Sequence, residues 1–476
     1  MSLFKNSTYN LIAAIFPIIL GLITIPIYLR TIGLATYGVL AVLLAALGYL
    51  GFLDLGLGKA LTQKIAELGV GRELRKQHIV SVATVMTFLI CAICSIVVWV
   101  ILVNLGSLGL SSVVVIRTIQ AYSPYIVAFI PIILFSSIFQ GVLQAESKFL
   151  TLSIIQLTGS VAMQVIPLLI AIFVNTEIEA LISGILIARC ITLALLTKEA
   201  HAVIKIKFNL NTLKRKRHGL VSYGGYSSVI SILNQFLVMF DRFVILSLCE
   251  ARAVTFYAIP SDIFSKISIL PNSVSGPIFT MAANKNTNNI KKITDEITLV
   301  ISKILTPIIL VLIYFGNYFI EKWVGAEISD NTEYVTLFLV VGLYFNALVI
   351  PRHAVILATI GPKVMVKCYL IELPFYILSL WFLVENYGVS GAAFAWMLRC
   401  CIDFILILAI SNSLKDTFIS CYKYIGLLLL SIVINLSDFI SYNYIIILFI
   451  FEIFILINFD LKFYKILLSE YFRKYK

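Results

Sequence analysis

Charged residues are scarce in this sequence. They make up 13% of its 476 residues, whereas hydrophobic residues make up 61%, compared with roughly 45–50% in soluble domains. The mean hydropathy is correspondingly high, at +1.02. This composition excludes an ordinary soluble protein and predicts an integral membrane protein.

Features of secreted proteins are also missing. Only Lys5 precedes the first apolar run. That run is longer than the roughly 7–15 residues of a signal-peptide core and no small-x-small cleavage site follows it, so we expect it to remain as a membrane span. The eight cysteines lie in or beside apolar runs, which argues against a disulfide framework. Cys91 and Cys94 have C-x-x-C spacing without a nearby histidine, so we interpret them as packing residues and expect no metal site.

A nucleotide-binding motif is absent as well. The segment GLGKAL, residues 56–61, lacks the first glycine of a phosphate-binding loop and has Ala60 where that loop needs Ser or Thr. We therefore expect no cofactor, and any energy-requiring step must draw on an ion gradient or on the gradient of a substrate itself.

The sequence does contain a series of continuous apolar runs. Strands of a membrane barrel would alternate polar and apolar residues, so continuous runs of about 20 residues predict transmembrane helices. Fourteen are expected, and twelve spans with a re-entrant hairpin is the alternative, because only Ser441 and Tyr442 separate the last two runs. The expected spans are residues 8–29, 34–57, 79–103, 122–144, 149–174, 178–197, 220–249, 254–282, 297–320, 334–360, 364–386, 391–411, 424–440 and 443–460.

The basic residues predict the orientation of these spans. Lysines and arginines gather in one set of alternating loops, which we place in the cytoplasm by the positive-inside rule together with both termini. The opposite loops carry only Arg30, Arg117, Arg252 and Lys322. The net charge of +12 is therefore a topology signal and an attraction to anionic membrane lipids, not a sign of nucleic-acid binding. The tail after residue 460 is expected to lie on the inner membrane surface as an amphipathic helix.

An internal repeat accompanies the helix pattern. At an offset of 220 residues the matching pairs are Tyr37 with Tyr257, Pro131 with Pro351, and Gly141 with Gly361, and past a ten-residue slip Arg189 falls on Arg399. These matches predict two parallel six-helix lobes about an axis along the membrane normal, an arrangement typical of transporters. We expect the N-lobe at residues 1–197, a basic cytoplasmic linker at 198–219, the C-lobe at 220–413, and helices 13 and 14 with a basic tail at 414–476.

Four segments carry a resemblance to a known family. They are NSTYNLIAAIFPIILGLITIPIYLRTIGLATYGVLAV, GYLGFLDLGLGKAL, GGYSSVISILNQFLVMFDRFVILSL and YAIPSDIFSKISILPNSVSGPIFTMAA. With them the chain resembles, over nearly its whole length, the multidrug/oligosaccharidyl-lipid/polysaccharide (MOP) exporters, and within these the Wzx-type O-antigen and capsule repeat-unit flippases.

The resemblance implies a function. It implies an all-helical fold like that of multidrug exporters of the MATE type, which belong to the same superfamily. It also implies translocation of an undecaprenyl-diphosphate-linked oligosaccharide across the bacterial cytoplasmic membrane by alternating access, with membrane lipids and other polysaccharide-assembly proteins as partners. On this basis we expect a transporter, not an enzyme.

Three alternatives remain open at this stage. A cation-coupled drug exporter of the same superfamily would need a net acidic cavity, whereas the uncompensated intramembrane residues here are mostly basic. A membrane-embedded polymerase or glycosyltransferase would need a sizeable external segment, but the longest outer loops, 104–121 and 321–333, are short. A lipid II flippase is a close variant of the favoured interpretation.

Ionisable residues inside the spans are the candidate functional residues, because an intramembrane charge normally faces a bundle interior or a watery cavity. Arg189 and Arg352 have no acid three or four residues away, and a guanidinium matches a diphosphate or an acidic sugar. An interhelical ion pair with Glu372 or another acid is the structural alternative. The candidate substrate-binding cations are Arg189, Arg352, Arg242 and Arg399.

A second group is considered for ion coupling. Asp262 with Lys266 and Arg399 with Asp403 have i,i+4 spacing, so each pair is expected to neutralise itself on one helix face. Adjacent residues Asp241 and Arg242 cannot pair in this way, and the alternative for them is snorkelling by the arginine with a hydrogen bond from the aspartate to a neighbouring helix. The candidate ion-coupling residues are Glu372, Asp241 and His353.

Overall fold

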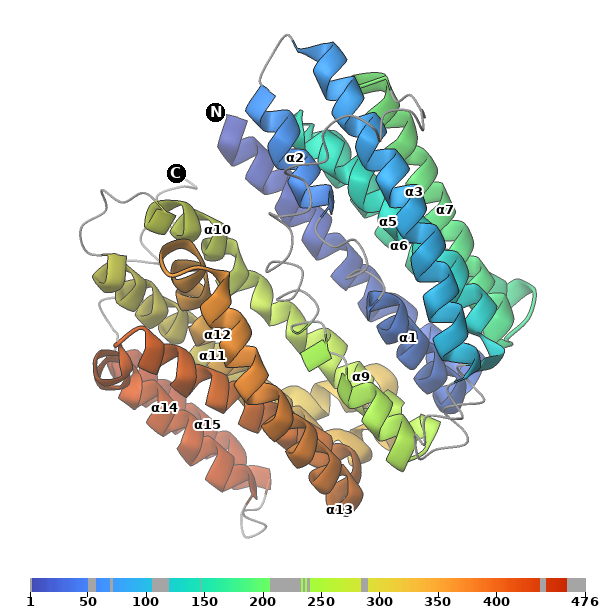
Figure 1. The fold of residues 1–476 in the computed structure, drawn as a ribbon. Coiled ribbons are helices and arrows are strands. Elements are labelled where there is room, and N and C mark those ends of the chain that lie inside the picture. The colour runs from blue at the N-terminus through green and yellow to red at the C-terminus, as the bar shows by residue number, and fades with distance from the viewer. Residues whose placement is uncertain are drawn as a thin grey trace, which may run out of the picture. The chain divides into compact units, whose positions relative to one another are not determined.

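The computed structural model describes the chain in segments. These are residues 2–49, 57–68, 72–104, 120–146, 148–205, 233, 236–237, 240–283, 290–436 and 442–459, and within them the secondary structure is helical without any strand. The chain divides into two compact units, Met1–Thr255 and Phe256–Lys476, which Figure 1 shows as helical bundles. The predicted linker at 198–219 and the predicted span at 220–249 lie largely outside the described segments, so the predicted lobe boundaries stay a prediction.

The N-terminal unit contains six of the labelled helices. They are α1 (Ser2–Tyr49), α2 (Leu57–Leu68), α3 (Glu73–Val103), α5 (Ser123–Ala145), α6 (Phe149–Phe173) and α7 (Ile178–Val203). Helix α1 contains a break at Gly33, where φ is 76° and ψ is 168°, a conformation that glycine adopts readily because it lacks a Cβ atom. The break falls between the predicted spans 8–29 and 34–57.

Helix α2 was not among the predicted spans. Its apolar residues Leu57, Leu61 and Ile65 recur every four positions and are all buried, so one face of a short amphipathic helix packs into the core. The core of this unit joins that face to buried side chains of α3, α5, α6 and α7. A search for membrane-length apolar runs misses such a helix because it is short and its other face is polar.

The C-terminal unit is built around α12. Its elements are the end of α9 (Ala251–Phe264), the 3₁₀ turn η4 (Ser265–Ser268), α10 (Ile269–Ala283), α11 (Ile290–Val324), α12 (Ala326–Thr359), α13 (Pro362–Ile410), α14 (Leu414–Leu436) and α15 (Tyr442–Phe459). Helix α12 packs against α10, α11 and α13, and its consecutive residues 339–344 are all buried, so this part of the helix is covered on all sides. The unit thus has a central helix whose polar side chains must find partners inside the protein.

Helix α13 is a reversed pair of helices. A straight helix of its 49 residues would extend about 74 Å, more than twice the roughly 30 Å of a hydrocarbon core. At Gly388, φ is 57° and ψ is −134°, and a Cβ at Gly391 would collide with the Leu383 carbonyl oxygen. The break falls between the predicted spans 364–386 and 391–411.

Ten helices of the described part are long and apolar enough to cross a membrane. Two of the ten, in α1 and α13, each include parts of two predicted spans, and α15 contributes only a shorter apolar stretch, Ile446–Asn458. The all-helical membrane architecture is confirmed, whereas the number of fourteen spans stays a prediction.

Candidate functional site

Two buried carboxyl groups meet inside the C-terminal unit. Glu372 and Asp403 are 1% and 3% exposed, and they are close enough to interact electrostatically. Both belong to α13, at nearly equal chain distances before and after the break at Gly388. Because a hairpin places residues equidistant from its turn at the same height, the reversal of α13 brings the two acids together.

His353 of α12 completes this acidic pair. Its Nε2 atom lies 3.3 Å from Oδ1 of Asp403, and its ring makes an edge contact with Tyr369 at 6.5 Å between centroids. Neither oxygen of Glu372 has a hydrogen-bond donor within the described segments. One carboxyl group of the cluster is thus held by a histidine while the other is unsatisfied, an arrangement suited to holding a proton.

Arg399 lies near this cluster but does not pair with it. Its guanidinium stands over the rings of Tyr376 and Trp396, at 5.7 and 5.9 Å from their centroids, and Nη2 is 3.7 Å from Sγ of Cys400. Among the residues the structure describes, it has no carboxylate within ion-pair distance. The predicted Arg399–Asp403 pair is therefore wrong. Both side chains contact other groups instead: Arg399 lies over the two aromatic rings, and Asp403 contacts His353 of α12.

The predicted pair of Asp262 and Lys266 is also wrong. Lys266 is exposed and makes no ion pair in the described part of the chain. It lies in η4 (Ser265–Ser268), where the 3₁₀ turn changes the angular spacing on which an i,i+4 pair depends.

Arg352 is held in an interhelical ion pair. It is 2% exposed, and its Nη2 donates to Oδ1 of Asp295 on α11 at 2.6 Å and to Oγ1 of Thr417 on α14 at 2.6 Å. This geometry favours the structural alternative for Arg352, with Asp295 in place of Glu372 as the partner. Sequence reasoning missed Asp295 because it precedes the predicted span 297–320, whereas α11 begins at Ile290.

Arg189 of α7 has a different environment. It is partly buried, and its guanidinium makes no hydrogen bond or ion pair with any residue the structure describes. An unpaired arginine in the middle of a membrane-length helix retains its full capacity to bind an anion.

Asp241 and Arg242 belong to the N-terminal unit. Asp241 is 1% exposed, and its Oδ1 accepts the backbone N–H of Arg242 at 2.8 Å. The carboxylate is thus engaged locally at the start of the described stretch, and residues 241–248 continue as helix.

The described residues contain no group of three or more His, Cys, Asp or Glu side chains that could hold a metal ion. Of the seven candidate residues, the structure brings together Glu372, His353 and Arg399, and adds Asp403. It places Arg352 in a separate ion pair, and it locates Arg189, Asp241 and Arg242 in the other unit.

Ten membrane-length helices with ionisable groups buried among them define a polytopic helical membrane protein. The chain belongs to the polysaccharide biosynthesis protein family, whose model matches residues 3–283. It is 25% identical to a Shigella flexneri protein named as an O-antigen transporter, over 86% of this chain and 97% of that protein.

Solved structures show the same fold. A lipid II flippase, MurJ in an inward closed conformation, matches with a TM-score of 0.73 and 16% identity, over 96% of this chain and 99% of that one. An inward-facing multidrug transporter of the MATE family, in the MOP superfamily, matches with a TM-score of 0.64 and 12% identity, over 86% and 99% of the two chains. The predicted family is thereby confirmed, as is an all-helical membrane fold like that of the MATE transporters, while the number of fourteen spans and the two six-helix lobes stay predictions.

Proposed function

We propose that this protein is a flippase that translocates an undecaprenyl-diphosphate-linked oligosaccharide, an O-antigen or capsule repeat unit, from the inner to the outer leaflet of the bacterial cytoplasmic membrane. The observation that carries the proposal is the relationship to an O-antigen transporter along almost the whole length of both chains. The fold shared with a lipid II flippase supports it, since that protein is named for moving a lipid-linked precursor.

The proposal includes a membrane and an orientation. The protein is a multi-pass membrane protein, and we assign it to the cytoplasmic membrane with both termini in the cytoplasm. The distribution of lysine and arginine supports this orientation.

Arg189 is the residue we assign to the anionic end of the substrate. A diphosphate accepts paired hydrogen bonds from a guanidinium, and Arg189 has no protein acceptor in the described part of the chain. Arg242 and Arg399 are secondary candidates for binding the anionic end. Arg352 forms an ion pair with Asp295, and we assign it a structural role.

The Glu372–Asp403–His353 cluster is the group we assign to energy coupling. Two adjacent carboxylates repel strongly in a medium of low dielectric, so the pair favours holding one proton between them. Exchange of that proton with either side of the membrane would link transport to the proton gradient. Asp241 remains a further candidate in the other unit.

Complementation tests the function. In cells that make a lipid-linked repeat unit but lack their own flippase, the wild-type protein is expected to restore surface polysaccharide. Arg189→Ala is expected to lower it by roughly tenfold or more, because a charge-assisted contact to the diphosphate is lost. Arg75→Ala is the matched control, since Arg75 is an exposed arginine in the described part of α3.

Three results would change this account. Equal activity of Arg189→Ala and Arg75→Ala at equal membrane levels would remove Arg189 from the substrate path. Failure of the wild type with every repeat unit supplied would contradict the flippase function itself. Drug export by the same protein in that case would favour a multidrug exporter of the same superfamily.

A further inference from the structure

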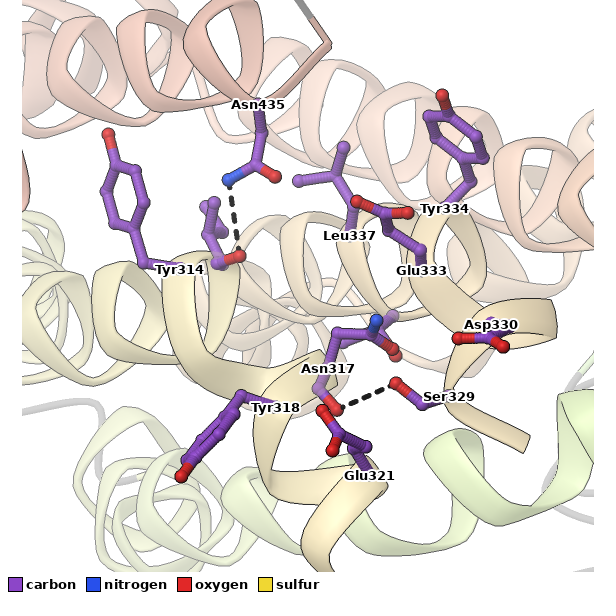
Figure 2. A pocket seen from close by; sticks show the side chains of 12 residues that line it. Tyr314, Asn317, Tyr318, Glu321, Ser329, Asp330, Glu333, Tyr334, Leu337 and Asn435 are labelled. Atoms are coloured by element: carbon purple, nitrogen blue, oxygen red, sulfur yellow. Dashed lines mark hydrogen bonds between the residues drawn. The ribbon is translucent and has the colours of Figure 1, made fainter. Parts of the chain in front are cut away.

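A polar cavity lies in the C-terminal unit away from the carboxyl cluster. It has a volume of about 220 Å³ and lies where the end of α11 meets the start of α12, beside the end of α14 (Figure 2). The charge-based topology places this end of the unit on the outer side of the membrane. Its lining residues are Ile313, Tyr314, Asn317, Tyr318, Glu321, Ser329, Asp330, Glu333, Tyr334, Thr336, Leu337 and Asn435.

Hydrogen-bond acceptors dominate this lining. Within the described residues, the carboxylates of Asp330 and Glu333 make no hydrogen bond or ion pair, while Glu321 pairs with Lys322 at 2.8 Å. Figure 2 shows the Glu333 carboxyl group turned toward Leu337 and Asn435, and the Glu321 carboxyl group turned toward Asn317. An ionised carboxylate has only acceptor capacity, so the cavity suits a ligand rich in O–H or N–H donors.

Fixed and buried polar groups accompany the acids. Thr336 is 2% exposed, and its hydroxyl has no partner among the residues the structure describes. The side-chain amide of Asn435 donates to the Ile313 carbonyl oxygen at 3.3 Å, and the Asn317 carbonyl oxygen accepts from the Ser329 hydroxyl at 3.2 Å. A buried hydroxyl without a hydrogen-bond partner costs folding free energy. A ligand that supplied a hydrogen-bond partner would remove this cost.

Size and composition narrow the ligand further. The volume is below the roughly 300–1,000 Å³ of sites for drug-sized molecules, so it fits one sugar ring better than a whole repeat unit. The described acids do not converge into a metal-binding group. Tyrosine rings, carboxylates and amides together offer apolar faces and acceptors, which match the two faces and the hydroxyl rim of a pyranose.

We propose that this cavity binds one uncharged or amino-bearing sugar ring of the translocated oligosaccharide on the outer side of the membrane, and that it disfavours acidic sugars. The inference rests on the proposed flippase function, because it assumes that the ligand is part of that substrate. The unpaired carboxylates of Asp330 and Glu333 accept hydroxyl or amino hydrogens, and they repel a sugar carboxylate.

Saturation-transfer NMR on the purified full-length protein in detergent tests the site directly. The probes are methyl N-acetylglucosaminide, methyl glucoside and methyl glucuronide. The wild type is expected to bind at least one of the first two and not the glucuronide. The double variant Asp330→Asn, Glu333→Gln is expected to lose roughly tenfold or more in affinity, while Glu385→Gln, an exposed acid elsewhere on α13, keeps wild-type binding.

Complementation of surface polysaccharide with the same variants separates the two claims. A wild type that restores polysaccharide but binds none of the probes would overturn the sugar site and leave the flippase function standing. Equal binding by the double variant, or equal binding of the glucuronide, would also overturn the site. Failure of complementation by the wild type would instead count against the flippase function.

Discussion

Glu372 and Asp403 are the residues on which the proposed coupling depends most. Each lies inside a predicted span where a lone charge is expensive, at least about 2.5 kcal/mol on insertion scales. Their adjacency lowers that cost only if a proton or a cation is shared between them. His353 is the nearest group with an ion-pair geometry to either of them among the described residues.

Replacement of Glu372 tests this cluster. Glu372→Gln keeps the shape of the side chain but cannot release a proton, so we expect surface polysaccharide to fall to roughly a tenth of the wild-type level or less. The residual activity should no longer respond to a protonophore, whereas wild-type activity should fall when the proton gradient is collapsed. Glu385→Gln serves as the control.

A protonophore response of Glu372→Gln equal to that of the wild type would remove Glu372 from coupling. An immunoblot would detect loss of the Glu372→Gln protein from the membrane. Such a loss would indicate that Glu372 acts in packing and not in coupling. The conservative change Asp403→Glu, which retains the exchangeable proton, is expected to keep part of the response.

The buried ion pair between Arg352 and Asp295 is expected to stabilise the folded protein. Removing one partner of a buried ion pair costs about 3–5 kcal/mol, and because Asp295 is 20% exposed we expect Arg352→Gln to cost up to about 3 kcal/mol. The double variant Arg352→Gln, Asp295→Asn should recover part of that loss, because no unpaired charge is left. Thermal unfolding of Arg352→Gln, Asp295→Asn and the double variant in detergent measures the coupling energy between the two residues.

If the losses of stability in the two single variants add up to the loss in the double variant, the two residues are not coupled. That result would contradict the structural role of Arg352 and make it a candidate for substrate binding again. A large transport defect in Arg352→Gln with unchanged thermal stability would lead to the same conclusion.

At the scale of the element, close contact between small residues joins α2 to α5. A Cβ on Gly141 would lie 2.6 Å from the Gly58 carbonyl oxygen, and Oγ1 of Thr62 donates to the Gly141 carbonyl oxygen at 3.1 Å. Such small-residue contacts allow two membrane helices to approach closely. The short α2 is thereby fixed to the unit.

Replacing glycine by alanine is expected to change stability differently at Gly141, in this contact, and at Gly426, outside it. Gly141→Ala should destabilise the protein by about 1–3 kcal/mol, because the added methyl group overpacks the contact. Gly426 lies on α14, and a Cβ added there would have no neighbouring atom within 4 Å. Gly426→Ala should therefore be neutral or stabilise the protein by up to about 1 kcal/mol, because alanine has the higher helix propensity. Thermal unfolding in detergent compares the two, and equal effects would contradict the packing.

Glu452 connects the last two described helices, α14 and α15. It is fully buried on α15, and its Oε2 accepts a hydrogen bond from the Ser431 hydroxyl of α14 at 2.7 Å. The sequence placed this acid in the last predicted span without giving it a role. The structure makes it a link between two neighbouring helices.

The sequence predicted elements better than side-chain partners, and the reason is physical. Apolar runs and the gap around Gly388 depend on local composition, so hydropathy located most helices of the described part. Spacing along one helix suggested the pair Arg399 with Asp403, but the observed partners, Arg352 with Asp295 and His353 with Asp403, lie on different helices. Packing between helices determines such pairs, and a single sequence does not encode it locally.

As a whole, the molecule is proposed to move a lipid-linked sugar between the two leaflets. Family membership, a full-length relative and the shared fold support it, while the charge clusters suggest how substrate and proton are handled. No local motif specifies the sugar repeat, because a binding cavity depends on shape contributed by many helices.

The most direct test measures in which leaflet the substrate lies. In cells that synthesise a lipid-linked repeat unit and lack their own flippase and polymerase, an impermeant reagent that modifies the oligosaccharide is added from outside. Expression of this protein is expected to make most of the lipid-linked oligosaccharide accessible to the reagent, and the Arg189→Ala variant is expected to do so much more slowly than the Arg75→Ala variant. If the inaccessible pool stays unchanged while the protein is present in the membrane at normal levels, the protein is not a flippase for this substrate.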